Sequence, residues 1–200
     1  MQLRNGKPVM FVADPQTAPD TKTYSYAKPD DISDSGKTWR SQLLDYNLDR
    51  ENNSFNLLPA WQLYANPTYE CLVRKFGNQK IFILSAGWGL LAADFLTPVY
   101  DITFSASAEA FKRRRKKDVY QDLNLLPADL AEPVIFLGGK DYTPLFCHLT
   151  ENIKSKRTIV YNSITPPDAS DCSLVRFETT TRTNWHYGCA NAIIEGSFIV

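Results

Sequence analysis

Several side chains that can act as acids, bases or hydrogen-bonding groups follow short apolar runs in this 200-residue chain. Asp14 stands directly after the run PVMFVA, and Asp101 lies downstream of the run KIFILSA. A carboxylate in such a place can position a water molecule or stabilise a developing positive charge. His186, in RTNWHY near the end of the chain, can hydrogen-bond a leaving group. Asp14, Asp101 and His186 are therefore the candidate catalytic residues.

Each candidate also has an interpretation without chemistry. Asp14 precedes a proline, and Asp-Pro is a common turn pair. His186 could be a surface group satisfied by its neighbours. The second histidine, His148, stands in the apolar stretch LFCHL, for which packing is the better interpretation.

Aromatic, amide and basic side chains near the same places could recognise a flat ligand. The stretch SAGWG (85–89) joins small residues, which allow a close approach, to the ring of Trp88. Rings stack on planar groups, and an amide such as Asn184 can pair with the edge of a base. The candidate ligand-binding residues are Ser85, Trp88, Tyr100, Lys140, Tyr142, Asn184 and Trp185.

Six consecutive basic side chains occupy FKRRRKKD (111–118), within a segment (107–123) whose composition predicts a helix. One interpretation is a solvated surface. The other is DNA binding, because the formal net charge of the chain is zero and these cations concentrate positive charge locally. We expect contacts to the DNA backbone from Lys112, Arg113, Arg114, Arg115, Lys116 and Lys117.

Other chemistries have weak support in the sequence. DISDSGKT (31–38) ends like a phosphate-binding loop, but Asp31 stands where that motif needs glycine, so a helix capped by Ser35 is the better interpretation. No GxSxG elbow surrounds Ser85. The four cysteines show no CxxC spacing and only two histidines are present, so we expect no metal and no cofactor.

The N-terminal sequence has no apolar signal core, and no apolar run approaches the length of a membrane span. We therefore expect a cytoplasmic protein with reduced thiols and no membrane partner.

The candidate residues must be positioned by strands and helices. Along the chain, apolar runs that predict strands alternate with segments that predict helices. Continuous hydrophobicity is typical of strands in a sheet covered on both faces. It predicts strands at 8–13, 80–86, 133–139 and 157–163, with a last strand at 174–179. Helices are predicted at 36–48, at 58–77 with a break near Pro67, at 107–123, at 143–153 after a Thr143 cap, and around 184–194. The alternation favours a single α/β domain over 1–200, a three-layer sandwich with a mostly parallel central sheet.

Polar, turn-rich stretches follow four of the predicted strands. They are ADP (13–15), SAGWG (85–89), GGKDY (138–142) and NSITPP (162–167). Ligands of open α/β sheets bind beyond the carboxyl ends of the strands, so we expect one composite site there. The long irregular segment 14–35 is a further candidate for function.

The central part of the chain, roughly 58–150, resembles the YaaA-like family of bacterial proteins. Its members combine a strand ending in an SA..GL turn, a P.YD element and a strand that reaches a Gly-Lys-Tyr turn. Here the matching residues are Ser85, Ala86, Gly89, Leu90, Pro98, Tyr100, Asp101, Gly139, Lys140 and Tyr142. The resemblance implies a fold related to uracil-DNA glycosylases, with links to DNA binding, DNA damage and base modification.

The chain departs from that family at its first strand, where VADPQTAP replaces a Ser-Cys-x-Lys-like turn. An acid and a proline after the first strand are similar to the water-activating turn of DNA glycosylases. We therefore expect an enzyme that flips a modified base out of DNA and cleaves its N-glycosidic bond, in phage defence or repair. Two alternatives remain open: a DNA-binding stress-response protein without catalysis, and a hydrolase acting on free nucleosides or nucleotides.

Overall fold

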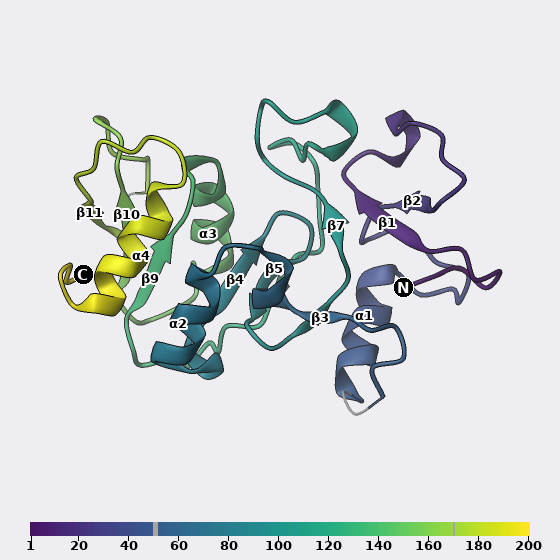
Figure 1. Cartoon of the computed structure of the whole chain (residues 1–200), viewed down its shortest axis with the longest axis horizontal. Coiled ribbons are helices and arrows are strands. Elements are labelled where there is room, and N and C mark those ends of the chain that lie inside the picture. Colours follow the sequence, from purple (N-terminus) through teal and green to yellow (C-terminus); the bar gives the residue numbers. More distant parts are fainter. Residues whose placement is uncertain (50–51, 170) are drawn as a thin grey trace.

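The computed structural model describes residues 1–49, 52–169 and 171–200. Within them the strands form four small sheets, and five of the seven strand pairs are parallel. The mixed α/β class and the dominance of parallel pairing are therefore confirmed. The predicted single central sheet is not seen, because the strands are divided among separate sheets (Figure 1).

Two of the sheets are parallel throughout and lie on either side of the molecule in Figure 1. The first has the order β2 (Ser25–Ala27), β1 (Val9–Val12), β7 (Tyr100–Asp101). The second has the order β11 (Ser173–Arg176), β10 (Arg157–Tyr161), β9 (Val134–Leu137).

Between them lies the sheet β4 (Phe82–Ser85), β5 (Gly89–Ala92), β8 (Leu123–Asn124), in which β4 and β5 form an antiparallel hairpin. The fourth sheet pairs β3 (Leu58–Pro59) with β6 (Leu96–Thr97). All five predicted strands are present, each within the predicted segment or shifted by one residue at its start.

The helices are α1 (Trp39–Leu48), α2 (Thr68–Phe76), α3 (Thr143–Leu149) and α4 (Trp185–Glu195). Short 3-10 turns are η1 (Pro15–Thr17), η2 (Ala60–Leu63), η3 (Asn78–Lys80), η4 (Ala110–Lys112) and η5 (Lys140–Tyr142). Among the described residues, no helix is both long and apolar enough to cross a membrane.

Helices cover both faces of the sheet that contains β10. Ile159 packs with Phe146 of α3, whereas the next residue, Val160, packs with Trp185 and Cys189 of α4. Because adjacent strand residues point to opposite faces, α3 and α4 lie on opposite sides of this sheet. The predicted three-layer arrangement is therefore present around β9, β10 and β11.

The largest core cluster joins β1 to α1 and to the turn after β4. The Phe11 ring lies edge-on to Trp88 at 4.9 Å and to Trp39 at 5.8 Å between ring centroids. Phe11, Trp88 and Leu43 are fully buried. This contact fixes the turn after β4 against the first strand.

The helix predicted over 107–123 is wrong. The segment contains the single turn η4 and then leads into β8. Its backbone is bonded to Thr103 instead: the Thr103 amide donates to the Lys112 carbonyl, and the Arg114 amide donates to the Thr103 carbonyl, both at 2.9 Å. These long-range bonds take the place of the local bonds of a helix.

Two of the predicted helix caps also differ from those in the structure. Helix α1 is capped by Thr38, whose side chain accepts a 3.0 Å bond from the Ser41 amide, and not by Ser35. In α3, Thr143 is the first helical residue and Pro144 follows within the first turn.

Candidate functional site

The turn between β4 and β5, Ser85–Gly89, is closed by its own serine. The Ser85 hydroxyl oxygen accepts bonds from the amides of Gly87 (3.2 Å) and Trp88 (3.0 Å). Gly89 has φ of +95°, a left-handed conformation that favours glycine. The small residues predicted here for ligand approach thus form a tight, buried turn.

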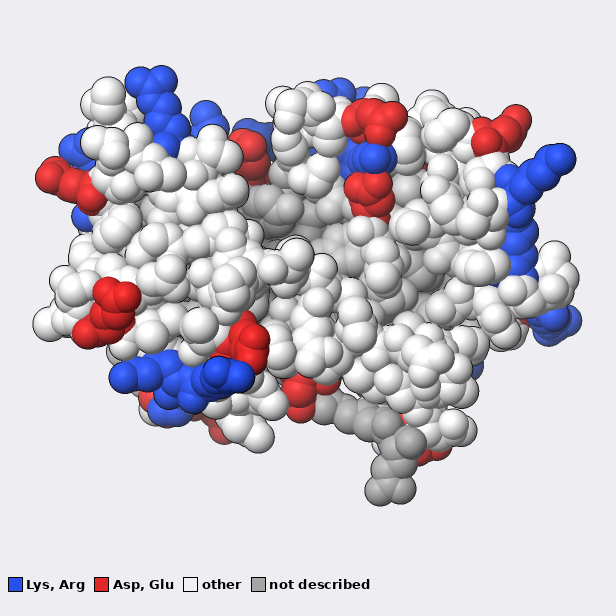
Figure 2. All heavy atoms as spheres, viewed as in Figure 1, with Lys and Arg blue, Asp and Glu red and all other residues white. Residues whose placement is uncertain are grey.

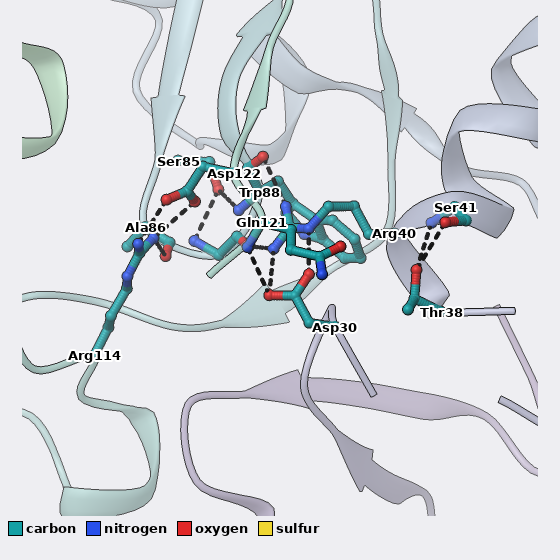
Figure 3. A network of polar contacts seen from close by, with 11 residues as sticks. Asp30, Thr38, Arg40, Ser41, Ser85, Ala86, Trp88, Arg114, Gln121 and Asp122 are labelled. Atoms are coloured by element: carbon teal, nitrogen blue, oxygen red, sulfur yellow. Dashed lines mark hydrogen bonds and ion pairs between the residues drawn. The ribbon is translucent and has the colours of Figure 1, made fainter. Parts of the chain in front are cut away.

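Two buried arginines hold this turn from two sides (Figure 3). Arg40 of α1 donates to the carbonyls of Gly87 and Trp88, each at 2.9 Å, and pairs with Asp30 at 2.6 Å. Arg114 donates to the Ala86 carbonyl at 2.8 Å and pairs with Asp122 at 2.6 Å. Each guanidinium is therefore compensated both by a carboxylate and by carbonyl oxygens.

This clamp determines what the turn can do. The carbonyl oxygens of three consecutive residues are occupied by guanidinium groups. The Trp88 ring is fully buried beside Phe11, and the Arg40 guanidinium lies 5.5 Å from its centroid. The structure thus corrects one prediction: Trp88 is a core residue and cannot stack on a ligand from solvent.

Trp185 is a second predicted stacking residue that the structure places in the core. It is 7% exposed and packs with Val160 and Cys189. Its neighbour Asn184 is exposed, has a left-handed backbone (φ +59°) and precedes α4. Burial of the ring follows from the α4 contact with the sheet.

A cluster of tyrosines extends from Ser85 through Tyr100 and replaces the predicted tryptophans as the aromatic part of the site. The hydroxyls of Tyr64 and Tyr100 are 2.7 Å apart, and Tyr100 also hydrogen-bonds the Ser85 side chain. Tyr69 stacks on Tyr64 with ring centroids 4.8 Å apart. Burial raises the pKa of Tyr64, Tyr69 and Tyr100, so these phenols stay neutral near pH 7.

The cluster continues to His186 on α4. The ring of Tyr187 lies 5.9 Å from Tyr69 and 4.2 Å from His186. A cavity of about 50 Å³, lined by Tyr69, Leu137, His186 and Tyr187 among others, lies at the carboxyl end of β9. Burial lowers the pKa of His186, which favours its neutral form. His186 thus adjoins the predicted ligand side of the sheet.

The predicted turn 138–142 contributes Tyr142 to the same region. The Tyr142 ring lies edge-on to Phe104 with ring centroids 4.9 Å apart, and the Tyr142 hydroxyl hydrogen-bonds the Thr103 side chain. Burial raises the pKa of Tyr142. Lys140, in the 3-10 turn before α3, is exposed.

The two candidate carboxylates leave neighbouring strands. In the parallel pair of β1 and β7, Val12 is opposite Asp101, and Asp14 lies two residues beyond Val12. The Asp101 carboxylate is half-exposed and 2.9 Å from the Lys112 ammonium, which also contacts Glu109 at 2.7 Å. Bonds to these two acids raise the pKa of Lys112. The Asp14 side chain makes no cap bond to η1.

Asp101 and Tyr100 are adjacent in β7, so their side chains point to opposite faces of the strand. The structure therefore places Asp101 and Lys112 together on one side of β7, and Asp14 follows the neighbouring strand β1. On the other side it brings together Ser85, Tyr100 and, through the ring cluster, His186. The two groups adjoin at this strand. Figure 2, which has the same orientation as Figure 1, shows a hollow near the middle of the surface.

The basic run lies at this edge, but it is only partly available to a partner. Lys112 and Arg115 are in ion pairs, Arg115 with Asp118 at 3.2 Å, and Arg113 donates to the Ala106 carbonyl. Lys116 and Lys117 are exposed. Arg114 was predicted to contact the DNA backbone, and this prediction is wrong. Its side chain is only 8% exposed, and its guanidinium, paired with Asp122, stabilises the turn instead.

A larger cavity lies in a different place. It measures about 380 Å³, lies between β4 and β9, and its wall is mostly apolar, with Leu84, Val134 and Phe136. Neither Asp14 nor Asp101 lines it. Its two charged lining residues, Lys80 and Glu132, are exposed and pair with each other at 3.4 Å, so we take the strand-end carboxylates and not this cavity as the candidate site.

The residues that sequence reasoning missed are Asp30, Arg40, Tyr64, Tyr69, Glu109 and Asp122. Arg40 lies beside Trp39 and Leu43 on the buried side of α1, and these two apolar neighbours were the one available signal of a buried cation. The others become neighbours only through contacts distant in sequence. In the part of the chain that the structure describes, no group of acidic, histidine or cysteine side chains could hold a metal ion.

No curated protein and no solved structure matches the chain. One family model does match, over residues 52–163, which is more than half of the chain. The matched part contains the turn after β4, the pair Tyr100–Asp101, the basic run and Tyr142, whereas Asp14 and His186 lie outside it. The chain therefore belongs to DUF6884, a family of unknown function.

Proposed function

We propose that the protein hydrolyses an N-glycosidic bond, with a modified base in DNA as the first candidate substrate. The observation that carries this proposal is the pair of carboxylates, Asp14 and Asp101, at the ends of the adjacent strands β1 and β7. A relationship to the fold of uracil-DNA glycosylases is part of the same proposal. It is supported by the parallel strand pairs and by the position of the acids at the carboxyl ends of β1 and β7.

The chemistry requires a negative group beside the sugar. In the proposed reaction a water oxygen bonds to the anomeric carbon, and the C–N bond breaks with its electron pair passing to the base. The sugar becomes positively charged as this bond breaks, so a nearby carboxylate lowers the barrier. Asp101, held by Lys112, provides that charge. Asp14 accepts the proton of the attacking water.

The leaving base needs a binding surface of its own. A base that leaves the DNA stack loses a few kcal/mol, which aromatic contacts can offset. Tyr142, Tyr187 and His186 are the partly exposed rings on the proposed base side. A neutral His186, favoured by its lowered pKa, can hydrogen-bond the departing base.

A second candidate substrate is a free nucleoside or nucleotide. The observation that favours it is the internal pairing of the basic run, since Lys112, Arg114 and Arg115 already have acidic partners. The face in Figure 2 also shows acidic and basic side chains interspersed, without an extended basic surface. A monomer does not need such a surface.

A base-release survey tests the proposal and separates the two substrates. The protein is incubated with single-stranded and duplex DNA that carries unmodified, uracil, hydroxymethylated or glucosylated bases, and with the matching nucleosides and nucleotides. Released bases and alkali-labile abasic sites are measured. We expect release from one substrate class, with loss in Asp14→Asn and retention in Asp45→Asn, an exposed acid on α1. Absence of release from every substrate would overturn the proposal.

A further inference from the structure

Two cysteines that lie far apart in the sequence meet beside the sheet of β9, β10 and β11. Cys147 is on α3, and Cys172 directly precedes β11. Both pack against the cluster of Phe136, Phe146 and Ile159. Burial and the nearby Cys172 thiol raise the pKa of the Cys147 thiol, and both residues are partly exposed.

The surrounding contacts hold the two elements together. Arg157 at the start of β10 donates to the Thr150 hydroxyl at the end of α3 (3.4 Å) and to the Asp171 carbonyl (3.2 Å). The Cys172 amide donates to the Ala169 carbonyl at 3.1 Å. Phe146, the neighbour of Cys147, stacks on Phe136 with ring centroids 4.8 Å apart. The two cysteines are thus positioned from both sides by packing and hydrogen bonds.

We propose that Cys147 and Cys172 form a reversible disulfide, a modification site that links α3 to the segment before β11. The oxidant is a small disulfide such as oxidised glutathione. The thiolate of one cysteine attacks the glutathione disulfide and releases one reduced glutathione, which leaves a mixed disulfide. The second thiolate then attacks the protein sulfur and releases the other reduced glutathione. Two protein thiols are oxidised and one glutathione disulfide is reduced.

The remaining two cysteines supply internal controls. Cys71 on α2 is exposed, and Cys189 on α4 is fully buried against Val160 and Trp185. Cys71 reports that the oxidant is active, because its thiol is open to mixed-disulfide formation. Cys189 reports whether the protein stays folded during oxidation.

The experiment equilibrates the full chain with graded ratios of reduced to oxidised glutathione. Burial and the neighbouring Cys172 raise the pKa of the Cys147 thiol to about 11, so incubation continues at mildly alkaline pH until no further change occurs. Free thiols are then alkylated, and disulfide-linked peptides are identified by mass. We expect one internal link, Cys147 to Cys172, in the wild type and in Cys71→Ser, and loss of this link in Cys172→Ser.

A second readout does not depend on peptide mapping. The oxidised protein should unfold at a higher temperature than the reduced protein, because a cross-link restricts the unfolded chain. This shift should be absent in Cys147→Ser and in Cys172→Ser. Glutathione attached separately to Cys147 and Cys172, a link to Cys71, or free thiols under conditions that oxidise Cys71 would each overturn the proposal.

Discussion

At the scale of single residues, Arg40 is the clearest case of a buried charge that stabilises the candidate site. Its guanidinium is 3% exposed and bonds Asp30 and the carbonyls of Gly87 and Trp88. Removal of one partner from a buried ion pair costs about 3–5 kcal/mol, because the other charge stays buried without compensation.

Arg40→Ala should therefore lower the free energy of unfolding by about 3–5 kcal/mol in chemical denaturation. The matched control is Arg74→Ala. Arg74 forms an exposed ion pair on α2 with Glu70, which lies one helical turn before it. Pairs of that kind contribute about 0.3–0.5 kcal/mol. Equal effects of the two substitutions would contradict the clamp.

His186 gives the stability a dependence on pH. Burial lowers its pKa below the ordinary value of 6.5, so the unfolded chain binds more protons than the folded chain as the pH falls through about 6.5. Stability from this group is complete above pH 6.5 and is lost below it. His186→Gln should flatten the decline in unfolding free energy between about pH 6.5 and 5. The control is His148→Gln, because His148 is exposed. An unchanged slope of unfolding free energy against pH in His186→Gln would show that other groups cause the decline.

Residue types alone predicted the acids at the strand ends but not their environments. Asp14 could be placed because it follows an apolar strand and strand ends converge in α/β sheets. Asp101 belongs to β7, a two-residue strand with no apolar run to predict it. Trp88 could not be separated from a ligand-stacking ring, because its burial depends on Phe11 and Arg40, which are distant in sequence.

At the scale of elements, the hairpin of β4 and β5 depends on one glycine. Gly89 has φ of +95°, and a Cβ atom there would lie 2.2 Å from the Leu123 carbonyl oxygen in β8. A side chain would meet both a strained backbone conformation and a rigid neighbour.

Gly89→Ala should destabilise the protein by about 2–5 kcal/mol, from about 1–2 for the left-handed conformation and about 1–3 for overpacking. Gly139→Ala is the control, because no atom lies within 4 Å of the position of its added Cβ and its φ is −66°. Thermal unfolding measures both. A melting temperature of Gly89→Ala close to that of Gly139→Ala would contradict this account of the hairpin.

The predictability of the elements follows the range of their interactions. Strands β1, β4, β9 and β10 were predictable because each is a short, continuous apolar run. The segment 107–123 was not, since its helix-forming composition is overridden by the bonds of Thr103 and by the Arg114–Asp122 pair. Tertiary partners of that kind leave no periodic signal in the sequence.

At the scale of the whole molecule, the charge distribution determines which substrate the protein can hold. Lys116 and Lys117 are exposed beside the candidate site, whereas the rest of the basic run is bonded internally or buried. If DNA is the substrate, these two lysines are the phosphate contacts that the run still offers.

Replacement of Lys116 and Lys117 by glutamine should then reduce the slope of log affinity against log salt by about 0.9 for each lost phosphate contact. Lys154 and Lys156 are a matched control pair, since both are exposed before β10, at the opposite end of that strand from the predicted ligand side. Binding is measured by fluorescence anisotropy with a labelled oligonucleotide. An unchanged slope, with activity on nucleosides intact, would favour the monomer as substrate.

The arrangement of the sheets was the least predictable property at this scale. Alternating strands and helices predicted the α/β class and the layers around β10. The antiparallel pairing of β4 with β5 depends on the turn at Gly89, which brings the chain back beside β4. The division into separate sheets has no signal in the pattern of apolar runs.

The most direct test of the proposed reaction is single-turnover base release by Asp101→Asn on whichever substrate the wild type cleaves. The substitution keeps the size of the side chain, and Lys112 retains Glu109 as a partner, so the fold should persist. We predict a loss of release of at least about 100-fold with substrate binding retained, because the missing charge is needed only as the bond breaks. Release at the wild-type rate by a folded Asp101→Asn protein would contradict the role of the strand-end carboxylates.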